Sequence, residues 1–178
     1  NRRQRQMCIR DSICSAPGSG IADDKAIYIY VPEMIKFYLG EQPILDNVET
    51  WNCEKKDHLK YVIDNISNLV IKEVDGSGGY GMLIGPKSST VEIEEFKNKL
   101  IHNSNGYIAQ PLLDLSFSPT LIKNQVEGRR VDLRPFCLMG KEAQLNSGGL
   151  TRVAMNEGSF VVNSSQGGGV KDTWILAE

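Results

Sequence analysis

Apolar residues recur along the chain with two different spacings. Helical spacing predicts helices over residues 25–39, 55–65 and 91–102, with Pro32 dividing the first of them into two short helices. Runs rich in β-branched residues predict strands at 69–74, 82–84, 106–110, 129–138, 150–155, 159–163 and 172–176. Helices lead and strands follow, so we expect an α+β fold, a mixed α/β chain with a mostly antiparallel second half.

The size and charge of the chain restrict its partners. Its 178 residues suffice for one domain or two small subdomains with a sizeable core. No apolar run approaches the ~20 residues that cross a bilayer. The net charge of −2 provides no electrostatic footprint for nucleic acid or anionic lipid. We therefore expect neither a membrane nor a nucleic acid as partner.

The first twelve residues, NRRQRQMCIRDS, follow neither spacing. Back-translated, Arg2 to Ser12 resemble the primer and transposon-end sequence of a sequencing-library adapter, and the alternative is a disordered basic arm. We exclude residues 1–12 from the fold and expect residues 13–178 to represent the protein, with an upstream part missing. Without their four arginines and one aspartate, the net charge moves from −2 to −5, which argues further against nucleic acid.

Cysteine usage indicates a reducing compartment. Outside the first segment lie Cys14, Cys53 and Cys137, an odd number without CxxC spacing, which does not suit a disulfide framework. A cytoplasmic location is the simplest prediction. We expect these cysteines to be core or half-buried residues, since no paired histidine supports a nucleophile.

Residues 76–81, Gly-Ser-Gly-Gly-Tyr-Gly, contain the spacing GxGxxG. A dinucleotide fingerprint would open a helix, whereas residues 82–84 continue as a strand, so the pattern predicts a glycine-rich hairpin flap. No Gly-Lys-Ser/Thr follows, which excludes a Walker A loop, and no HRD or DFG sequence supports a protein kinase. Backbone N–H groups of such a flap can hold nucleotide phosphates, and Lys72 on the entering strand can add a point charge. The alternative is an empty hairpin beside a solvated lysine.

A second group of charged residues lies in the later strands. Alternation puts Asp132 and Arg134 on one face of the apolar segment VDLRPFCL, where burial is costly unless they pair or bind a ligand. Arg152 follows in GGLTRVA, and a strand then meets a polar glycine turn at 163–169, which brings backbone near a ligand or is a flexible loop. A structural role explains each motif singly. Together with Lys72 and the flap, the two arginines are suited to clamping a triphosphate.

The order of these motifs resembles the ATP-grasp superfamily. The matching features, in chain order, are Lys72, Gly76–Gly81, the hinge-like Tyr107–Pro111, Asp132-Leu133-Arg134, Arg152 and Asn163–Gly169. The chain is closer still to the circularly permuted ATP-grasp proteins of bacteria, through the blocks GSGIADDKAIYIYVPEMIKFYLGEQPIL, KEVDGSGGYGMLIGP, AQPLLDLSFSPT, RRVDLRPF, GGLTRVA and VVNSSQGGGVKDTW. The resemblance covers residues 13–178, as the C-terminal part of a longer protein. It implies an ATP-grasp-like antiparallel sheet with a glycine-rich hairpin flap and flanking helices.

The resemblance also implies ATP and Mg²⁺ as ligands. Lysines and the flap would hold the phosphates, and the backbone after residue 109 would meet adenine. The residues implied in ATP binding are Lys25, Lys72, Gly76, Ser77, Gly78, Gly79, Tyr80, Gly81, Gln110, Pro111 and Leu112. For Lys25 a capped surface helix is the alternative, with Asp23 or Asp24 as the cap.

The remaining implied roles concern catalysis and the metal. Arg134 and Arg152 would stabilise the γ-phosphoryl group and an acyl phosphate. Asp132 would orient Arg134 or touch the metal, and Asn163 would approach metal or phosphate. The acidic-Asp-Asn element that holds Mg²⁺ in this family does not occur in the chain. We therefore expect the main metal ligands to lie upstream.

The function implied is that of an ATP-dependent carboxylate–amine ligase, of which this chain is the nucleotide-binding part. One alternative is a nucleotide-binding module without ligase activity, and another is an ATP-grasp phosphotransferase. Similarity to peptide-type ligases suggests a peptide or amino-acid carboxylate as substrate and an amine as acceptor, by analogy alone.

Overall fold

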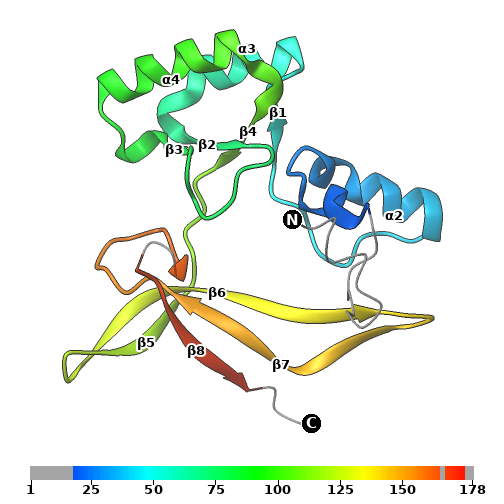
Figure 1. Cartoon of the computed structure of the whole chain (residues 1–178), viewed down its shortest axis with the longest axis vertical. Helices are drawn as coiled ribbons and strands as arrows, with labels where there is room; N and C mark the ends of the chain where they lie inside the picture. The colour runs from blue at the N-terminus through cyan, green and yellow to red at the C-terminus, as the bar shows by residue number, and fades with distance from the viewer. Residues whose placement is uncertain (1–17, 165–166, 175–178) are drawn as a thin grey trace, which may run out of the picture. The chain divides into compact units, whose positions relative to one another are not determined.

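The computed structural model describes residues 18–164 and 167–174, and these form two compact units (Figure 1). The first unit contains the residues up to Asp75 and Leu83–Pro111. The second contains Gly76–Met82 and the residues from Leu112 onward. Residues 1–12 and Cys14 lie outside the described part, so the adapter interpretation stays a prediction.

Among the described residues, every helix of four or more residues belongs to the first unit. Its elements are η1 (Ser19–Asp23), η2 (Ile27–Tyr30), α2 (Val31–Leu39), β1 (Trp51–Asn52), α3 (Lys56–Asn65), η3 (Ile66–Asn68), β2 (Leu69–Glu73), β3 (Leu83–Ile84), η4 (Gly85–Lys87), α4 (Thr90–His102), η5 (Ser104–Gly106) and β4 (Tyr107–Pro111). The predicted helices and strands of this region are thereby confirmed, and the two-residue strand β1 is an addition.

Local sequence explains where these helices begin. Pro32 lies in the first turn of α2, where its missing N–H costs nothing. The Asp24 carboxylate accepts hydrogen bonds from the N–H groups of Ala26 (2.8 Å) and Ile27 (3.1 Å), which fixes the turn just before η2, whose own N-cap position is Ala26. At α4, Ser89 and Glu92 form a reciprocal capping box. Helix α4 is therefore fixed at its N-terminus by its own sequence.

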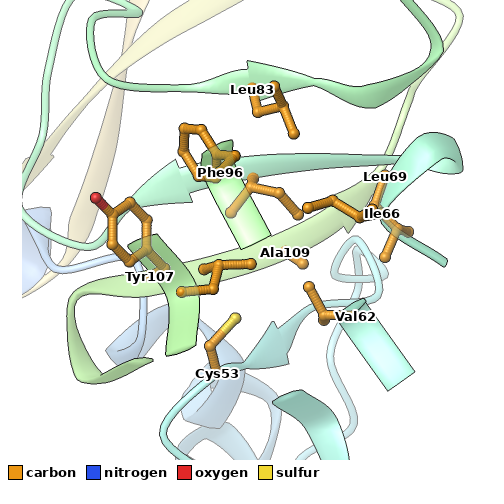
Figure 2. Packing of buried hydrophobic residues seen from close by; sticks show 10 residues of the cluster. Cys53, Val62, Ile66, Leu69, Leu83, Phe96, Tyr107 and Ala109 are labelled. Carbon is orange, nitrogen blue, oxygen red and sulfur yellow. The ribbon is translucent and has the colours of Figure 1, made fainter. Parts of the chain in front are cut away.

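The core of the first unit lies between its sheet and two helices. The strands are antiparallel in the order β1-β4-β2-β3. Helices α3 and α4 supply Val62, Phe96 and Leu100 to a cluster that also includes Ile71 and Ala109 of the sheet (Figure 2). Burial of these side chains, at about 1.5–3 kcal/mol for each large one, is the main stabilising term. Strands β2 and β4 thereby become a firm base for the polar residues at their ends.

The second unit is a four-stranded antiparallel sheet of long strands (Figure 1). Its strands, in spatial and chain order, are β5 (Phe117–Ile122), β6 (Gln125–Met139), β7 (Ala143–Val153) and β8 (Gly169–Trp174). The strand predicted at 129–138 lies within the longer β6, and the one predicted at 150–155 overlaps the end of β7, which stops at Val153. Strand β8 includes residues 172–174 of the strand predicted at 172–176, whose last two residues lie outside the described part. The α+β class with antiparallel sheets is confirmed.

Two expectations for the second unit are wrong, and one of its strands was not predicted. Residues 159–163 form no strand: the Val161 N–H bonds locally to the Ser159 hydroxyl (3.1 Å), directly after the turn at residues 157–158. Strand β5 was not predicted, since Pro119 interrupts its β-pattern, although an edge strand tolerates proline. Cys137 is exposed on β6, whereas Cys53 is fully buried as expected.

Candidate functional site

Lys72 lies on β2, where antiparallel pairing sets it opposite Ile108 of β4. Its Nζ donates a hydrogen bond to Oε1 of Gln110 at 2.7 Å. Gln110 lies two residues further along β4, which makes the two side chains diagonal neighbours on one face. The alternative of a solvated lysine is therefore wrong for the described structure, since Lys72 is half-buried and bonded.

Lys25 comes close to the same place. Its backbone N–H and its Nζ both donate to the carbonyl oxygen of Val74, each at 3.2 Å, just beyond the end of β2. Burial, and then the positive charge of Lys25, lower the pKa of Lys72 below its usual 10.5. The positive charge of Lys25 thus disfavours the charged form of Lys72. An anionic ligand would relieve that repulsion.

The glycine loop after β2 has a backbone that glycine alone adopts readily. Gly78, Gly79 and Gly81 have φ values of 72°, 79° and 68°. The N–H of Tyr80 donates to the Ser77 carbonyl at 3.4 Å, which closes a turn. Strands β2 and β3 on either side are paired as an antiparallel hairpin, with Ile71 opposite Leu83. The predicted glycine-rich hairpin is confirmed, and the loop does not open a helix.

The predicted adenine segment falls at the end of β4. Gln110 and Pro111 pair with Val70 and Leu69 of β2, and Leu112 follows directly. The side chain of Gln110 is engaged twice, because its Nε2 also donates to the Thr50 hydroxyl at 2.9 Å. Sequence analysis missed Thr50, and no motif around it signals a role. Lys25, Lys72 and Gln110 are thus brought together within the first unit.

The second unit gathers the other predicted residues into a polar cluster. One oxygen of Asp132, Oδ2, accepts from Arg134 Nε (3.1 Å) and Nη2 (3.0 Å). Its other oxygen, Oδ1, accepts from the backbone N–H of Arg152 at 3.3 Å, on the residue paired with Asp132 across β6 and β7. Arg152 Nη1 in turn donates to Asn163 Oδ1 at 2.6 Å. Asp132 and Arg134 share a face and pair, as alternation predicts.

The glycine turn after Asn163 is shaped by close approach to the chain itself. The N–H of Gly168 donates to the carbonyl oxygen of Asn163 at 3.0 Å. A Cβ on Gly168 would lie 2.2 Å from the Val162 carbonyl oxygen, so only glycine fits. This contact explains one of the three glycines without a ligand. Residues 165–166 of the turn lie outside the described residues.

The profile of the family described as circularly permuted ATP-grasp type 2 matches residues 9–154. The chain belongs to this family. The match spans both lysines, the glycine loop, Gln110, Asp132 and the two arginines, and it ends before Asn163.

Curated relatives of this ATP-grasp chain come from several bacteria. An uncharacterised protein of Synechocystis is 55% identical over 168 residues, which are 94% of this chain and 35% of the relative. An uncharacterised Mycobacterium tuberculosis protein is 51% identical over 93% of the chain and 30% of its own length. A Frankia casuarinae protein with the provisional name glutamate–cysteine ligase 2-2 is 45% identical, over 93% of the chain and 19% of its length. The chain spans about a third or less of these relatives.

The oxygen atoms predicted to touch a metal do not fit Mg²⁺ in this arrangement. Mg²⁺ requires oxygen ligands in near-octahedral order, but Asp132 Oδ2 and Asn163 Oδ1 accept from the charged guanidinium groups of Arg134 and Arg152, which repel a cation. Asp132 Oδ1 accepts from the backbone N–H of Arg152. Over residues 18–164 and 167–174, no three His, Cys, Asp or Glu side chains gather as a metal site.

Anionic phosphate, by contrast, fits the donors of both units. Arg152 Nε is buried and has no hydrogen-bond partner among the described residues, although such a donor is costly to leave unsatisfied. Lys25 and Lys72 repel each other in the first unit.

Among the helices that the structure describes, none is long and apolar enough to cross a membrane.

Proposed function

We propose that this chain is the ATP-binding part of an ATP-dependent carboxylate–amine ligase. The lysine pair carries the proposal, since two neighbouring ammonium groups, one of them with a lowered pKa, are suited to a polyphosphate. Membership of the ATP-grasp family and the provisional ligase name of the Frankia relatives support it.

In this proposal, Lys25 and Lys72 bind phosphate oxygens of ATP. The backbone N–H groups of residues 76–81 cover the triphosphate, and the backbone of Gln110–Leu112 meets adenine. Gly76, Gly78, Gly79 and Gly81 let the backbone approach the phosphates closely. The Mg²⁺ that accompanies ATP takes its ligands from parts of the longer protein that this chain does not include.

Arg134 and Arg152 act on the group being transferred. A carboxylate oxygen of the substrate attacks the γ-phosphorus, the bond from that phosphorus to the β–γ bridging oxygen breaks, and ADP leaves. The amine then attacks the acyl carbon, inorganic phosphate leaves, and the nitrogen loses a proton. Both steps build negative charge on phosphoryl oxygens, which positioned guanidinium groups stabilise. Asp132 and Asn163 hold those groups in place.

Calorimetry with MgATP tests the nucleotide site, in this chain and in a form extended to the length of its relatives. We expect Lys72→Met and Lys25→Met to weaken binding about tenfold to a hundredfold, as loss of a charge-assisted contact does. Lys60→Met is the matched control, because Lys60 is exposed on α3. If Lys72→Met and Lys25→Met bind MgATP as tightly as Lys60→Met does, the proposed phosphate site at Lys25 and Lys72 is contradicted.

Turnover by the extended protein distinguishes the three candidate activities. A ligase forms ADP and phosphate only when both a carboxylate and an amine are supplied. A phosphotransferase forms ADP and a stable phosphorylated product without the amine. A nucleotide-binding module binds MgATP and forms neither product. Glutamate and cysteine are the first substrate pair to supply, in view of the provisional names of the Frankia relatives.

A further inference from the structure

Lys72 is the first member of a chain of three side-chain hydrogen bonds. Its Nζ donates to Gln110 Oε1 at 2.7 Å, and Gln110 Nε2 donates to Thr50 Oγ1 at 2.9 Å. Thr50 Oγ1 then donates to the backbone carbonyl of Val48 at 2.8 Å. This relay crosses β2, β4 and the segment before β1, and all its members belong to the first unit.

Thr50 fixes the direction of the relay. A threonine hydroxyl has one proton, and here that proton goes to Val48, so the oxygen can meet Gln110 only as an acceptor. The amide of Gln110 must therefore turn Nε2 toward Thr50 and Oε1 toward Lys72. The relay places a neutral acceptor against the ammonium group and prevents the amide from presenting a donor there.

A neutral acceptor has a particular consequence for Lys72. An ammonium group has three N–H donors, and the bond to Gln110 uses one, which leaves the others for a ligand. A carboxylate in the same place would cancel the charge and compete with an anion. The amide instead orients the lysine while its positive charge stays uncompensated by any neighbour in the relay.

We propose that Gln110 and Thr50 are positioning residues, which aim the Lys72 ammonium at the phosphates of ATP and keep its charge available. The proposal deepens the nucleotide-binding function above and rests on it. Gln110 then contributes through its side chain as well as through its backbone, and Thr50 acts solely through Gln110.

The first test needs no nucleotide. The pKa of Lys72 is measured by carbon-13 NMR titration of its ε-carbon in the protein alone. We expect Gln110→Ala and Thr50→Val to lower that pKa, since the acceptor is lost or free to rotate, and Gln110→Glu to raise it. Thr50→Ser should restore the wild-type value, because it keeps the hydroxyl. Thr90→Val, at an exposed position of α4, is the matched control and should change nothing.

The second test is MgATP affinity in the extended protein. Gln110→Ala, Gln110→Glu and Thr50→Val should each weaken binding, by about tenfold for loss of an orienting bond to a charged group. The double variant Gln110→Ala/Thr50→Val should be no weaker than Gln110→Ala alone, because both changes break one relay. Gln110→Glu should thus weaken binding while raising the Lys72 pKa, and Gln110→Ala should weaken binding while lowering it. Simple misfolding does not produce that pair of results.

The outcomes separate this proposal from the one it rests on. If wild-type protein binds MgATP but Thr50→Val alters neither the Lys72 pKa nor the affinity, the relay has no positioning role and only this proposal fails. Tighter binding by Gln110→Glu would also overturn it. If wild-type protein binds no MgATP while the pKa shifts follow the expected pattern, the proposed function fails and the relay is merely structural.

Discussion

Lys72 of the first unit and Arg134 of the second unit are held by different kinds of partner. In the first unit, Lys72 follows the buried residues Val70 and Ile71 on β2, and its partner is a neutral amide. In the second, Arg134 stands beside Leu133, which is 63% exposed, and its partner is the carboxylate of Asp132. Lys72, next to a closed core, is held by a neutral amide, whereas Arg134, on an open sheet, is held by an ion pair.

This difference has a physical reason. An unpaired charge in a fully apolar setting is expensive, so Lys72 is left half-buried and receives one neutral bond. A guanidinium has several donors in a fixed plane, and a carboxylate can align it while water screens the pair. The orientation of Lys72 therefore depends on packing, whereas that of Arg134 depends on charge.

Thiol reactivity should show the largest contrast between the units. Burial raises the pKa of Cys53 from 9.0 to about 12, whereas Cys137 is exposed on β6. The rise in the Cys53 pKa lowers the thiolate fraction of Cys53 about a thousandfold, and burial blocks access to the sulfur as well. Timed alkylation with iodoacetamide, followed by peptide mass spectrometry, measures each cysteine separately. Comparable labelling rates for Cys53 and Cys137 in folded protein would contradict the closed core.

Truncation of one leucine in each unit should give the next largest effect. Leu100 is fully buried on α4, and Leu138 is 67% exposed on β6. We expect Leu100→Ala to lower the free energy of unfolding by about 2–5 kcal/mol, and Leu138→Ala by less than about 0.5 kcal/mol. Urea unfolding followed by circular dichroism measures both. A large loss for Leu138→Ala would mean that β6 is covered in solution.

Removal of the carboxylate in the second unit should have an intermediate effect. An asparagine at position 132 can offer oxygen to Arg134 or to the Arg152 N–H, but not to both. We expect Asp132→Asn to cost about 1–2 kcal/mol of unfolding free energy. Asp114→Asn is the control, since its ion pair with Arg130 involves a carboxylate that is 76% exposed, and it should cost less than about 1 kcal/mol. Equal losses of unfolding free energy in the two variants would show that the Asp132 hydrogen bonds contribute no more than an exposed ion pair.

The pH dependence of stability should give the smallest effect, because Lys72 is only half-buried. Its folded pKa is lowered by burial and by Lys25, so the unfolded chain binds more protons between that value and 10.5. Stability contributed by this group therefore rises as the pH increases through that interval. Lys25→Met removes part of the cause, and it should raise the Lys72 pKa and flatten the rise. Urea midpoints from neutral pH to 10.5 measure the difference, and identical curves would contradict the coupling.

Sequence patterns were sufficient for most of the first unit, because its elements satisfy local rules. Helix α4 has its own capping box at Ser89, and Pro32 marks the start of α2. The pairing of Asp132 with Arg134 also followed from alternation within one strand. Each of these features depends on residues only a few positions apart.

Contacts that depend on pairing between distant strands were not predictable. Gln110 meets Lys72 because β4 lies antiparallel to β2 in one register, and a shift by one residue would turn it to the other face. Asp132 reaches the Arg152 N–H through the register of β6 and β7. Residues 159–163 have β-branched composition but no strand partner, so their turn hydrogen bonds prevailed. The residue pattern within one strand does not predict which other strand it will pair with.

The strand order of the first unit has a consequence for synthesis on the ribosome. Strand β4 is the last strand of this sheet to be made, yet it occupies the position between β1 and β2. As the chain emerges from its N-terminal end, β1 and the β2–β3 hairpin must wait with open edges until β4 arrives. Insertion of Tyr107–Pro111 is therefore the closing event of this unit. The same event brings Gln110 to Lys72, so the nascent chain completes its sheet and orients its lysine in one step.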